Sequence, residues 1–389
     1  MEVNVEITKQ NLPIPASGLE KIKALELGNN KEKENLSRFK IPLPELDGAI
    51  DPDHPNLKTI LDNMAIFEAT RGGFSKATQK NMFSAVRSWI RFTEYIELAY
   101  AFPIHPRMFY YWILHLKNEQ KVSYATLMSR KNLIAIFLNQ LGFANVTEDK
   151  LIKDFFRGVK KDMAESDLSK VEQKVASPFR ASDLNRQIEI VGTLEQAGPK
   201  LFKDLAYMTI AYSTALREEE IFTLKRKNVI ISGDTVTIVR TKSKTSAAPP
   251  KKSIIGRYAG IVKKYIELVE NGVELYNHVT PSRPVEDQEY YIFGWILKNG
   301  QLKDPLKPMN GVSVLRLFRK AYERQSVFNG RCWSGHSARC GAVVDGHVVH
   351  KMNAVDLMSI GDWTNMGTVK RYLRATGHLE ASNIELQKH

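Results

Sequence analysis

Apolar residues recur at steps of three and four over residues 76–98, which is the spacing of one face of an α-helix. The apolar positions on this face are Met82, Val86, Trp89, Phe92 and Ile96. Ser75 stands directly before the segment, and serine is a preferred N-cap residue. The pattern therefore predicts a helix that begins after Ser75 and packs one face into a core.

The same spacing predicts three further helices before residue 165, and Ser123 is expected to cap the second of them. The residues that mark them are Met108, Trp112, Leu114 and Leu116, then Leu127, Leu133, Ile136 and Phe137, then Leu151, Ile152, Phe155, Phe156 and Val159. Residues 57–165 are therefore expected to form an all-α bundle of four or five helices.

The pattern of a β-sheet is confined to one region of the chain. The β-branched runs 229–231 and 236–239 are joined by Ser-Gly-Asp, which predicts a hairpin, and 253–255 is a candidate third strand. Helical patterns occupy 181–196, 199–213 and much of the chain after 259. The predicted fold is mainly α, with an N-terminal helical bundle and a C-terminal mixed α/β domain that contains a small antiparallel sheet.

Composition and polar stretches suggest the domain boundaries. Residues 1–56 hold six of the sixteen prolines and few core-forming positions, so we expect a flexible or loosely docked arm. The bundle then occupies 57–165, a polar linker 166–180, and the second domain 181–389. Its last residues, 377–389, hold a few apolar positions.

The net charge of +13 is unevenly distributed along the chain. The first 60 residues contain eight Lys or Arg and ten Asp or Glu, so the other 329 residues carry +15. A strongly basic body is typical of nucleic-acid-binding proteins. A basic enzyme of another kind or a binder of anionic membranes remains an alternative. No membrane-spanning run or signal-peptide pattern is present in the sequence, which predicts a cytoplasmic protein.

The last sixty residues carry the densest candidate chemistry. His336 and Arg339 are three residues apart, so on a helix both heads reach a single anion. Trp363 and Tyr372, nine residues apart, offer an indole donor and a phenol nearby. Cationic donors around a phosphate and an oxygen nucleophile beside it are what metal-free attack on a phosphodiester requires.

A zinc site is the competing interpretation of this segment. Its candidate ligands are Cys332, His336, Cys340, His347 and His350. Their spacing matches no closed structural zinc pattern, and Arg339 would repel a cation. We therefore expect no metal and no cofactor, and both cysteines as reduced thiols.

Several segments resemble the Cre-like tyrosine recombinases. They are Trp333-Ser334-Gly335-His336-Ser337-Ala338-Arg339, Thr214-Ala215-Leu216-Arg217, Arg240-Thr241-Lys242, Trp363-Thr364-Asn365 and Arg87-Ser88-Trp89. The resemblance covers roughly residues 57–380. It implies a site-specific DNA recombinase with seven catalytic residues, which are Arg217, Glu220, Lys242, His336, Arg339, Trp363 and Tyr372.

The resemblance implies a role for each of these residues, and the chemistry agrees. Arg217 and Arg339 grip the phosphate, His336 and Trp363 donate to it, and Tyr372 attacks the phosphorus. The remaining two roles are less specific. Lys242 is the expected general acid, although Lys244 is close enough to replace it, and Glu220 either orients its neighbours or only starts a helix.

Basic and polar residues on the predicted helix surfaces are candidates for DNA contacts. The bundle carries Lys80, Arg87, Arg130, Lys131, Arg157, Lys160 and Lys161 on its polar faces. The resemblance places a wider set against the duplex, namely Lys80, Asn81, Arg87, Ser129, Arg130, Lys160, Lys244, Asn310, Val312 and Ser313. Val312 stands where these recombinases place a guanine-binding arginine, so we expect a different target sequence.

The implied partner is double-stranded DNA with an inverted-repeat site. Four protomers would join two sites and exchange strands through a Holliday junction, and away from DNA they would be monomers or weakly associated. The resemblance also implies that the tail 377–389 docks on a neighbouring protomer. The expected origin is a bacterium, phage or plasmid, and the expected location is the nucleoid. Three alternatives share features of the chain. A phage or mobile-element integrase would carry an arm-binding domain, for which 1–56 is poor in core positions. A type IB topoisomerase would lack the bundle, and a non-cutting regulator would not need Tyr372.

Overall fold

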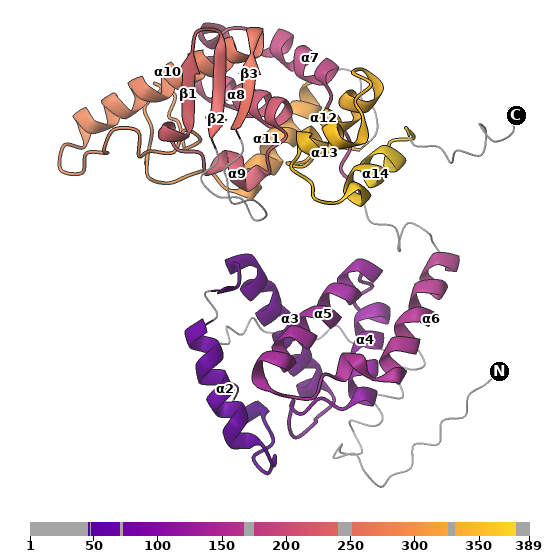
Figure 1. Cartoon of the computed structure of the whole chain (residues 1–389). Coiled ribbons are helices and arrows are strands. Elements are labelled where there is room, and N and C mark those ends of the chain that lie inside the picture. Colours follow the sequence, from indigo (N-terminus) through magenta and orange to yellow (C-terminus); the bar gives the residue numbers. More distant parts are fainter. Residues whose placement is uncertain are drawn as a thin grey trace, which may run out of the picture. The chain divides into compact units, whose positions relative to one another are not determined.

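The structure, a computed structural model, describes residues 46, 48–70, 73–166, 175–239, 251–325 and 331–378. They form two compact units, one before and one after the break at 167–174 (Figure 1). Within these ranges, no helix is both long and apolar enough to cross a membrane. The predicted class, a mainly helical chain with a small antiparallel sheet, is confirmed.

The N-terminal unit is a helical bundle around aromatic residues. Its elements are α2 (Leu57–Thr70), α3 (Lys76–Tyr95), α4 (Pro106–Asn118), α5 (Tyr124–Leu141), the short 3₁₀ helix η3 (Val146–Glu148) and α6 (Lys150–Ser166). Trp89 of α3 and Trp112 of α4 are fully buried, with ring centroids 5.8 Å apart in a T-shaped pair. The indole of Trp89 donates to the carbonyl of Ala101 at 2.8 Å, so its polar atom is satisfied inside the core.

Two serines begin helices in this bundle as predicted. The hydroxyl of Ser75 accepts from the backbone N–H of Thr78 at 3.1 Å, and that of Ser123 accepts from Thr126 at 3.3 Å. Each serine satisfies one of the N–H groups that the first turn of a helix leaves without a partner. Gly142, at φ +80°, then ends α5 in the left-handed conformation that glycine adopts readily.

Part of the segment expected to be a loose arm packs on the bundle. Leu46 and Ile50 are each only 2% exposed within the aromatic core. The backbone of Ile50 pairs with Phe102, and the N–H of Ala101 donates to the carbonyl of Ala49 at 2.8 Å. The described part of residues 1–56 therefore belongs to the folded unit, because its isolated apolar residues fill gaps between distant helices.

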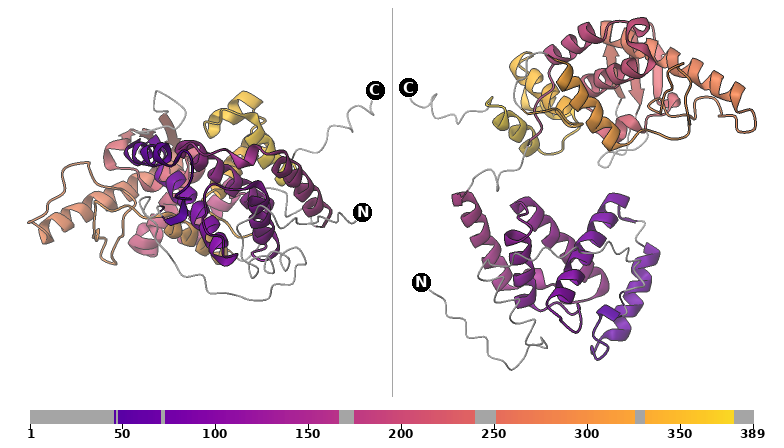
Figure 2. Two further views of the ribbon diagram at one scale, coloured as in Figure 1. Left: turned by 90° about the horizontal axis from the view of Figure 1, so that it is seen from below. Right: turned by 180° about the vertical axis from the view of Figure 1, so that it is seen from behind.

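The C-terminal unit combines helices with a three-stranded antiparallel sheet of order β1-β2-β3 (Figures 1 and 2). Its helices are α7 (Ala181–Val191), α8 (Leu194–Thr214), α9 (Glu218–Phe222), η5 (Arg226–Asn228), α10 (Gly256–Val279), α11 (Gly311–Arg324), α12 (Ser337–Val348), α13 (Ala354–Ile360) and α14 (Met366–Ala375). The strands are β1 (Val229–Ser232), β2 (Thr235–Val239) and β3 (Lys251–Ile255). The hairpin and the third strand stand where the β-branched runs predicted them.

Helix α8 organises this unit, since it packs against α7, α10, α12 and β3. Nearly its whole second half is buried. Near its start, Gly198 adopts φ +71° and ψ +166°, and Pro199 follows, so the helix is broken there. The sequence predicted helices over 181–196 and 199–213. The second corresponds to the part of α8 after this break, whereas the first is divided between α7, which ends at Val191, and the short start of α8.

The second unit begins earlier than residue 181. Phe179, within the range expected to be linker, is fully buried, and its ring centroid lies 4.7 Å from that of Trp333. Its N–H donates to the carbonyl of Ser337 at 2.9 Å, directly beside the candidate residue His336. Gly341 of α12 leaves room for this strand-like approach, because any side chain there would meet the backbone of Phe179.

A buried carboxylate ties α12 to α7 and α8. Asp345 is 3% exposed and accepts from the Arg180 guanidinium at 2.7 Å, from the N–H of Ala181 at 2.8 Å and from the hydroxyl of Tyr212 at 2.8 Å. Burial and the charge of Asp345 raise the pKa of Tyr212, so this hydroxyl stays protonated and donates. The network locks the far end of the helix that begins with His336.

We predict that Asp345→Ala destabilises the C-terminal unit by about 3 kcal/mol, because it leaves three donors without their acceptor. This loss of stability is at the low end of the range for breaking a buried ion pair, since the Arg180 side chain is 31% exposed. Thermal denaturation of the intact chain measures it. Asp234→Ala, which removes a fully exposed carboxylate paired with Lys263, is the control and should change stability by less than about 0.5 kcal/mol. Equal effects of both variants would contradict the assigned role.

Candidate active site

Arg217 is held in place by its neighbour three residues on. It is the N-cap of α9, and the carboxylate of Glu220 accepts from its backbone N–H at 2.8 Å and from its Nη1 at 2.9 Å. The first contact is one half of a capping box, and the second orients the guanidinium. Both alternatives raised for Glu220, helix start and orientation of a neighbour, describe contacts that the structure contains.

The turn before Arg217 brings a backbone carbonyl towards α12. Helix α8 ends at Ala215, whose φ of +48° lies in the left-handed region that a residue with a side chain rarely adopts. The carbonyl of Ala215 accepts a hydrogen bond from Nη1 of Arg339. Backbone strain of this kind persists where surrounding contacts compensate for it, and it is typical of functional sites.

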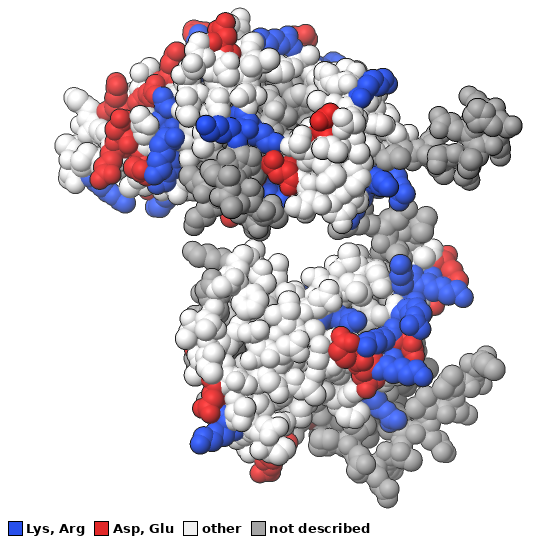
Figure 3. All heavy atoms as spheres, viewed as in Figure 1, with Lys and Arg blue, Asp and Glu red and all other residues white. Residues whose placement is uncertain are grey.

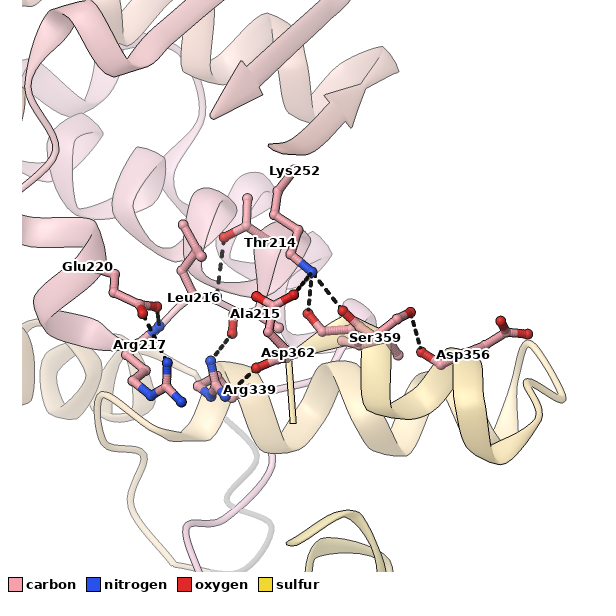
Figure 4. A network of polar contacts seen from close by, with 12 residues as sticks. Thr214, Ala215, Leu216, Arg217, Glu220, Lys252, Arg339, Asp356, Ser359 and Asp362 are labelled. Atoms are coloured by element: carbon pink, nitrogen blue, oxygen red, sulfur yellow. Dashed lines mark hydrogen bonds and ion pairs between the residues drawn. The ribbon is translucent and has the colours of Figure 1, made fainter. Parts of the chain in front are cut away.

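Arg339 projects from the first turn of α12 into the interior and is 3% exposed. Its Nη2 donates to the carbonyl of Gly361 at 2.9 Å, and its Nη1 to that of Ala215. A guanidinium has five N–H donors. The carbonyls therefore orient Arg339 and leave donors for a further acceptor. Figure 4 shows the guanidiniums of Arg339 and Arg217 near each other.

An indole and a phenol cover Arg339. The Cζ atom of Arg339 lies 4.7 Å from the ring centroid of Trp363, within the range of a cation–π contact. The ring of Trp363 in turn meets that of Tyr372, with centroids 5.7 Å apart and planes at 64°. Val369 and Leu373 are buried on either side of Tyr372, in a small cluster shared by α12, α13 and α14. This cluster packs α14 against α12 and α13, and Tyr372 on α14 thereby contacts the indole of Trp363.

The electrostatics place these groups in one neighbourhood. Burial lowers the pKa of Arg339, and the positive charge of Arg217 lowers it further. Tyr372, Glu220 and Asp362 act in the opposite direction. Two guanidiniums therefore repel each other in a poorly solvated place, and an anion bound between them would relieve that repulsion.

His336 stands at the entrance of α12. It is the N-cap of that helix, and its imidazole is exposed. Gly335 before it lies against the carboxylate of Glu218, where a side chain would clash. The hydroxyl of Ser337 accepts from the N–H of Ser334 at 2.8 Å, which closes the same turn. The structure thus presents His336 towards solvent one turn before Arg339.

Lys242 and Lys244, the two candidates for the general acid, lie outside the described residues. The structure instead shows a lysine that the sequence interpretation missed. Lys252 of β3 reaches the segment before Trp363, and its Nζ lies 3.2 Å from the carboxylate of Asp362. The signal was available, because strand alternation puts Lys252 on the same face as the buried Ile254.

The residues predicted to contact DNA from the bundle separate into two groups. Lys80, Asn81, Ser129, Arg157, Lys160 and Lys161 are exposed. Arg87, Arg130 and Lys131 are only partly accessible.

Arg130 donates to the hydroxyl of Ser84 at 3.1 Å, and burial lowers its pKa. Lys131 lies over the ring of Phe156 at 5.2 Å. Arg87 lines a pocket beside Gly48 and Ala49. These three cations therefore contribute to packing between helices of the bundle as well as to its charge.

The candidates on α11 are shaped by its first turn. Asn310 is the N-cap, and its Oδ1 accepts from the N–H of Ser313 at 3.0 Å and from the hydroxyl of Ser313 at 3.2 Å. Val312 is 57% exposed and Leu315 42% exposed, so α11 presents apolar side chains outward. Oδ1 of Asn310 is thus engaged by Ser313, and the side chain of Val312 lies exposed beside them.

Charge on the bundle is mixed. Figure 3 shows Lys and Arg gathered on the side where α6 lies, interspersed with Asp and Glu. Arg157 pairs with Asp154 at 2.9 Å, and Lys161 lies 3.8 Å from Glu165. These exposed pairs contribute little to stability, and they reduce the local positive field.

The cysteines differ in environment. Cys332 is exposed, whereas Cys340 is buried among apolar residues, and burial raises its pKa to about 12. Among the residues that the structure describes, no three His, Cys, Asp or Glu side chains are gathered as a metal site. The thiol of Cys340 is therefore part of the packing beneath α12.

The fold and these contacts define a class of protein, a chain of two mainly helical units whose C-terminal unit groups two arginines with a tryptophan and a tyrosine. The sequence profile of the Phage integrase family matches residues 180–378, more than half of the 389-residue chain. The chain belongs to this family, the tyrosine recombinases, which confirms the resemblance stated above.

Individual relatives agree with this assignment. The chain is 22% identical to Recombinase cre of Escherichia phage P1 over 315 residues, which are 78% of this chain and 85% of that protein. The Tn1549 transposon integrase in complex with transposon right end DNA has a TM-score of 0.54 at 15% identity, covering 85% of this chain and 97% of that one. A lambda integrase dimer bound to a COC′ core site has a TM-score of 0.50 at 15% identity, covering 94% and 88%. At these identities the structural likeness concerns the fold.

We predict that Gly361→Ala displaces the indole of Trp363, because a Cβ at this position would meet its ring atoms. The φ of −111° at Gly361 suits alanine, so the effect comes from the clash and not from backbone strain. Near-ultraviolet circular dichroism and a crystal structure of the variant measure the shift. Gly260→Ala, on α10 with open space around it, is the control and should leave the site unchanged. An unmoved Trp363 in Gly361→Ala would show that the turn is looser than its contacts indicate.

Proposed function

We propose that this chain is a site-specific DNA recombinase in which Tyr372 cleaves one strand and forms a 3′-phosphotyrosyl link. The observation that carries the proposal is the grouping of Arg339 with Arg217, Trp363 and Tyr372. A phosphodiester would place a negative charge between the two guanidiniums, which otherwise repel each other. Because Arg339 is 3% exposed, binding at its guanidinium requires the covering rings to shift.

Each step of the cleavage balances with groups of this chain. The phenol oxygen of Tyr372 attacks phosphorus and gives up its proton, and the bond from phosphorus to the 5′ oxygen breaks. A phenol ordinarily titrates near about pH 10, so a field of positive charges is needed to stabilise its anion. Arg217 and Arg339 supply that field, and the exposed His336 is positioned to accept the proton.

The leaving 5′ oxygen needs a proton. We assign this to the ammonium of a lysine between β2 and β3 in the chain, with Lys242 as the first candidate and Lys244 as the second. Negative charge that gathers on the other phosphate oxygens is stabilised by the arginines, by the indole N–H of Trp363 and by the positive end of α12. Protein donors thus supply the stabilisation, and the proposed reaction uses neither a metal nor ATP.

Strand exchange follows from the covalent link. The 5′ hydroxyl of a partner duplex attacks the phosphotyrosine, the bond from phosphorus to the phenol oxygen breaks, and Tyr372 recovers its proton. The energy of the broken phosphodiester is kept in the phosphotyrosyl link, so the free-energy change of strand exchange is close to zero. We propose that four protomers on two inverted-repeat sites perform it through a Holliday junction. The tail after 378, expected to dock on a neighbouring protomer, lies outside the described residues.

Three further observations support DNA as the substrate. The chain after residue 60 carries a charge of +15 by its Lys, Arg, Asp and Glu counts. Two structures of similar fold are integrases, one in complex with transposon right end DNA and one bound to a COC′ core site. In the C-terminal unit, the exposed Val312 offers an apolar contact that suits a thymine methyl group in the major groove.

We predict that the chain, incubated with fragments of its source genome in EDTA, forms covalent protein–DNA adducts whose ends map its target site. Tyr372→Phe should bind the same fragments and form no adduct, because only the phenol oxygen is removed. Tyr322→Phe, which removes another phenol from the same unit, is the matched control and should form adducts like the parent. Adducts with Tyr372→Phe would overturn the nucleophile, and a need for divalent metal would overturn the mechanism.

We predict that Lys242→Ala slows single-turnover cleavage by about 100-fold or more while DNA affinity changes little, since general acid catalysis contributes about 10²–10⁴-fold. Lys244→Ala, which removes the same charge two residues away, is the control. The measurement is adduct formation over time on the mapped site. A larger loss in Lys244→Ala than in Lys242→Ala would reverse the assignment.

A further inference from the structure

Lys252 occupies a position where strand geometry disfavours a lysine. In β3 the exposed residues alternate with inward-facing ones, and Lys252 shares the inward face with Ile254, which is 1% exposed. Its partner across the sheet is Ile238, which is fully buried. The side chain of Lys252 is only 17% exposed. A lysine here requires acceptors for its charge.

Those acceptors all come from the segment that precedes Trp363. The Nζ atom of Lys252 donates to the carbonyl of Ser359 at 2.7 Å and to that of Ile360 at 3.0 Å, and it lies 3.2 Å from Oδ1 of Asp362 (Figure 4). The two carbonyls belong to the last turn of α13, where helix carbonyls lack partners and the helix dipole favours a cation. Asp362 itself adopts a φ of +53°, a conformation that needs support from its surroundings.

The turn at 361–363 is therefore held from two sides. Arg339 binds the carbonyl of Gly361, and Lys252 binds the residues on either side of it. The N–H of Trp363 donates to the carbonyl of Met358 at 3.0 Å, so the indole is attached to the same turn. Movement of this turn would move Trp363, and with it the ring that contacts Tyr372.

We propose that Lys252 is a positioning residue for cleavage, which fixes the turn at 361–363 and thereby the placement of Trp363 and Tyr372. This inference rests on the proposed function and extends it to a residue outside the seven. It also couples two parts of the site. Lys252 lies in β3, the strand that follows the segment of Lys242 along the chain, so one side chain connects this part of the chain to the turn that carries Trp363.

The contacts also separate Lys252 from the general acid. An ammonium has three donors, and Lys252 has three acceptors within reach. Its proton donors are all engaged, whereas a general acid must direct one at the leaving oxygen. Lys252 therefore acts through the position of other residues, and this distinction gives its test a specific readout.

The first arm of the test needs no DNA. In Lys252→Met, amide hydrogen exchange of peptides covering 358–375 should become about 10-fold faster, because the end of α13 and the turn lose their tether. Peptides from α8 should exchange as in the parent. Lys251→Met is the matched control, since it removes the same charge from the neighbouring exposed position of β3. Unchanged exchange in Lys252→Met would overturn the proposal even if the chain cleaves DNA as expected.

The second arm uses the mapped target site in two forms, with oxygen or with sulfur at the 5′ bridging position. Lys252→Met should cleave the oxygen form about 10- to 100-fold more slowly at unchanged DNA affinity, as expected for a displaced nucleophile. Lys252→Arg should recover most of the rate, and Lys251→Met should match the parent. A sulfur leaving group departs without a general acid, so the loss in Lys252→Met should persist on the sulfur form.

The outcomes distinguish the two proposals. Full recovery of Lys252→Met on the sulfur form would make Lys252 the general acid and overturn the positioning role. An equal loss of cleavage rate in Lys251→Met would show that the effect comes from surface charge alone, and this would also overturn the positioning role. No adduct from the parent protein would instead remove the recombinase proposal, while the exchange arm would still decide whether Lys252 holds the turn.

Discussion

The site depends on a single buried cation. Arg339 carries its charge into a place with almost no solvent, and two backbone carbonyls, those of Ala215 and Gly361, orient it. The cost of desolvating a guanidinium is large unless it is hydrogen-bonded, so the segments that provide these carbonyls must be placed accurately. The end of α8, the first turn of α12 and the turn after α13 are thereby brought to one point.

Near Arg339, some charges are neutralised by their neighbours and others repel each other. Glu220 neutralises and orients Arg217, but the two arginines still repel each other. Ala215 and Asp362 both adopt left-handed backbone conformations next to the groups that bind Arg339 and Lys252. Such features lower stability locally, and buried contacts such as those of Asp345 offset them elsewhere.

The local elements were predictable because their signals are local. Ser75 and Ser123 cap the helices they precede, and the β-branched runs form the sheet in the expected order. The family was also predictable, and the match of its profile to residues 180–378 confirms it. The packing of residues 46–56 and of Phe179 was missed, because an isolated apolar residue in a polar stretch shows no period.

By itself the sequence determined the class of fold, the family and the side chains available for chemistry, because periodicity, turn residues and motif order are written along the chain. Only the tertiary structure decided which groups meet. Arg339 finds a carbonyl 124 positions away, and Lys252 reaches one 107 positions away. Backbone carbonyls are the same in every residue, so no sequence pattern marks the ones that a distant cation will bind. Long-range packing makes that choice when it brings the ends of α8 and α13 beside α12 and β3.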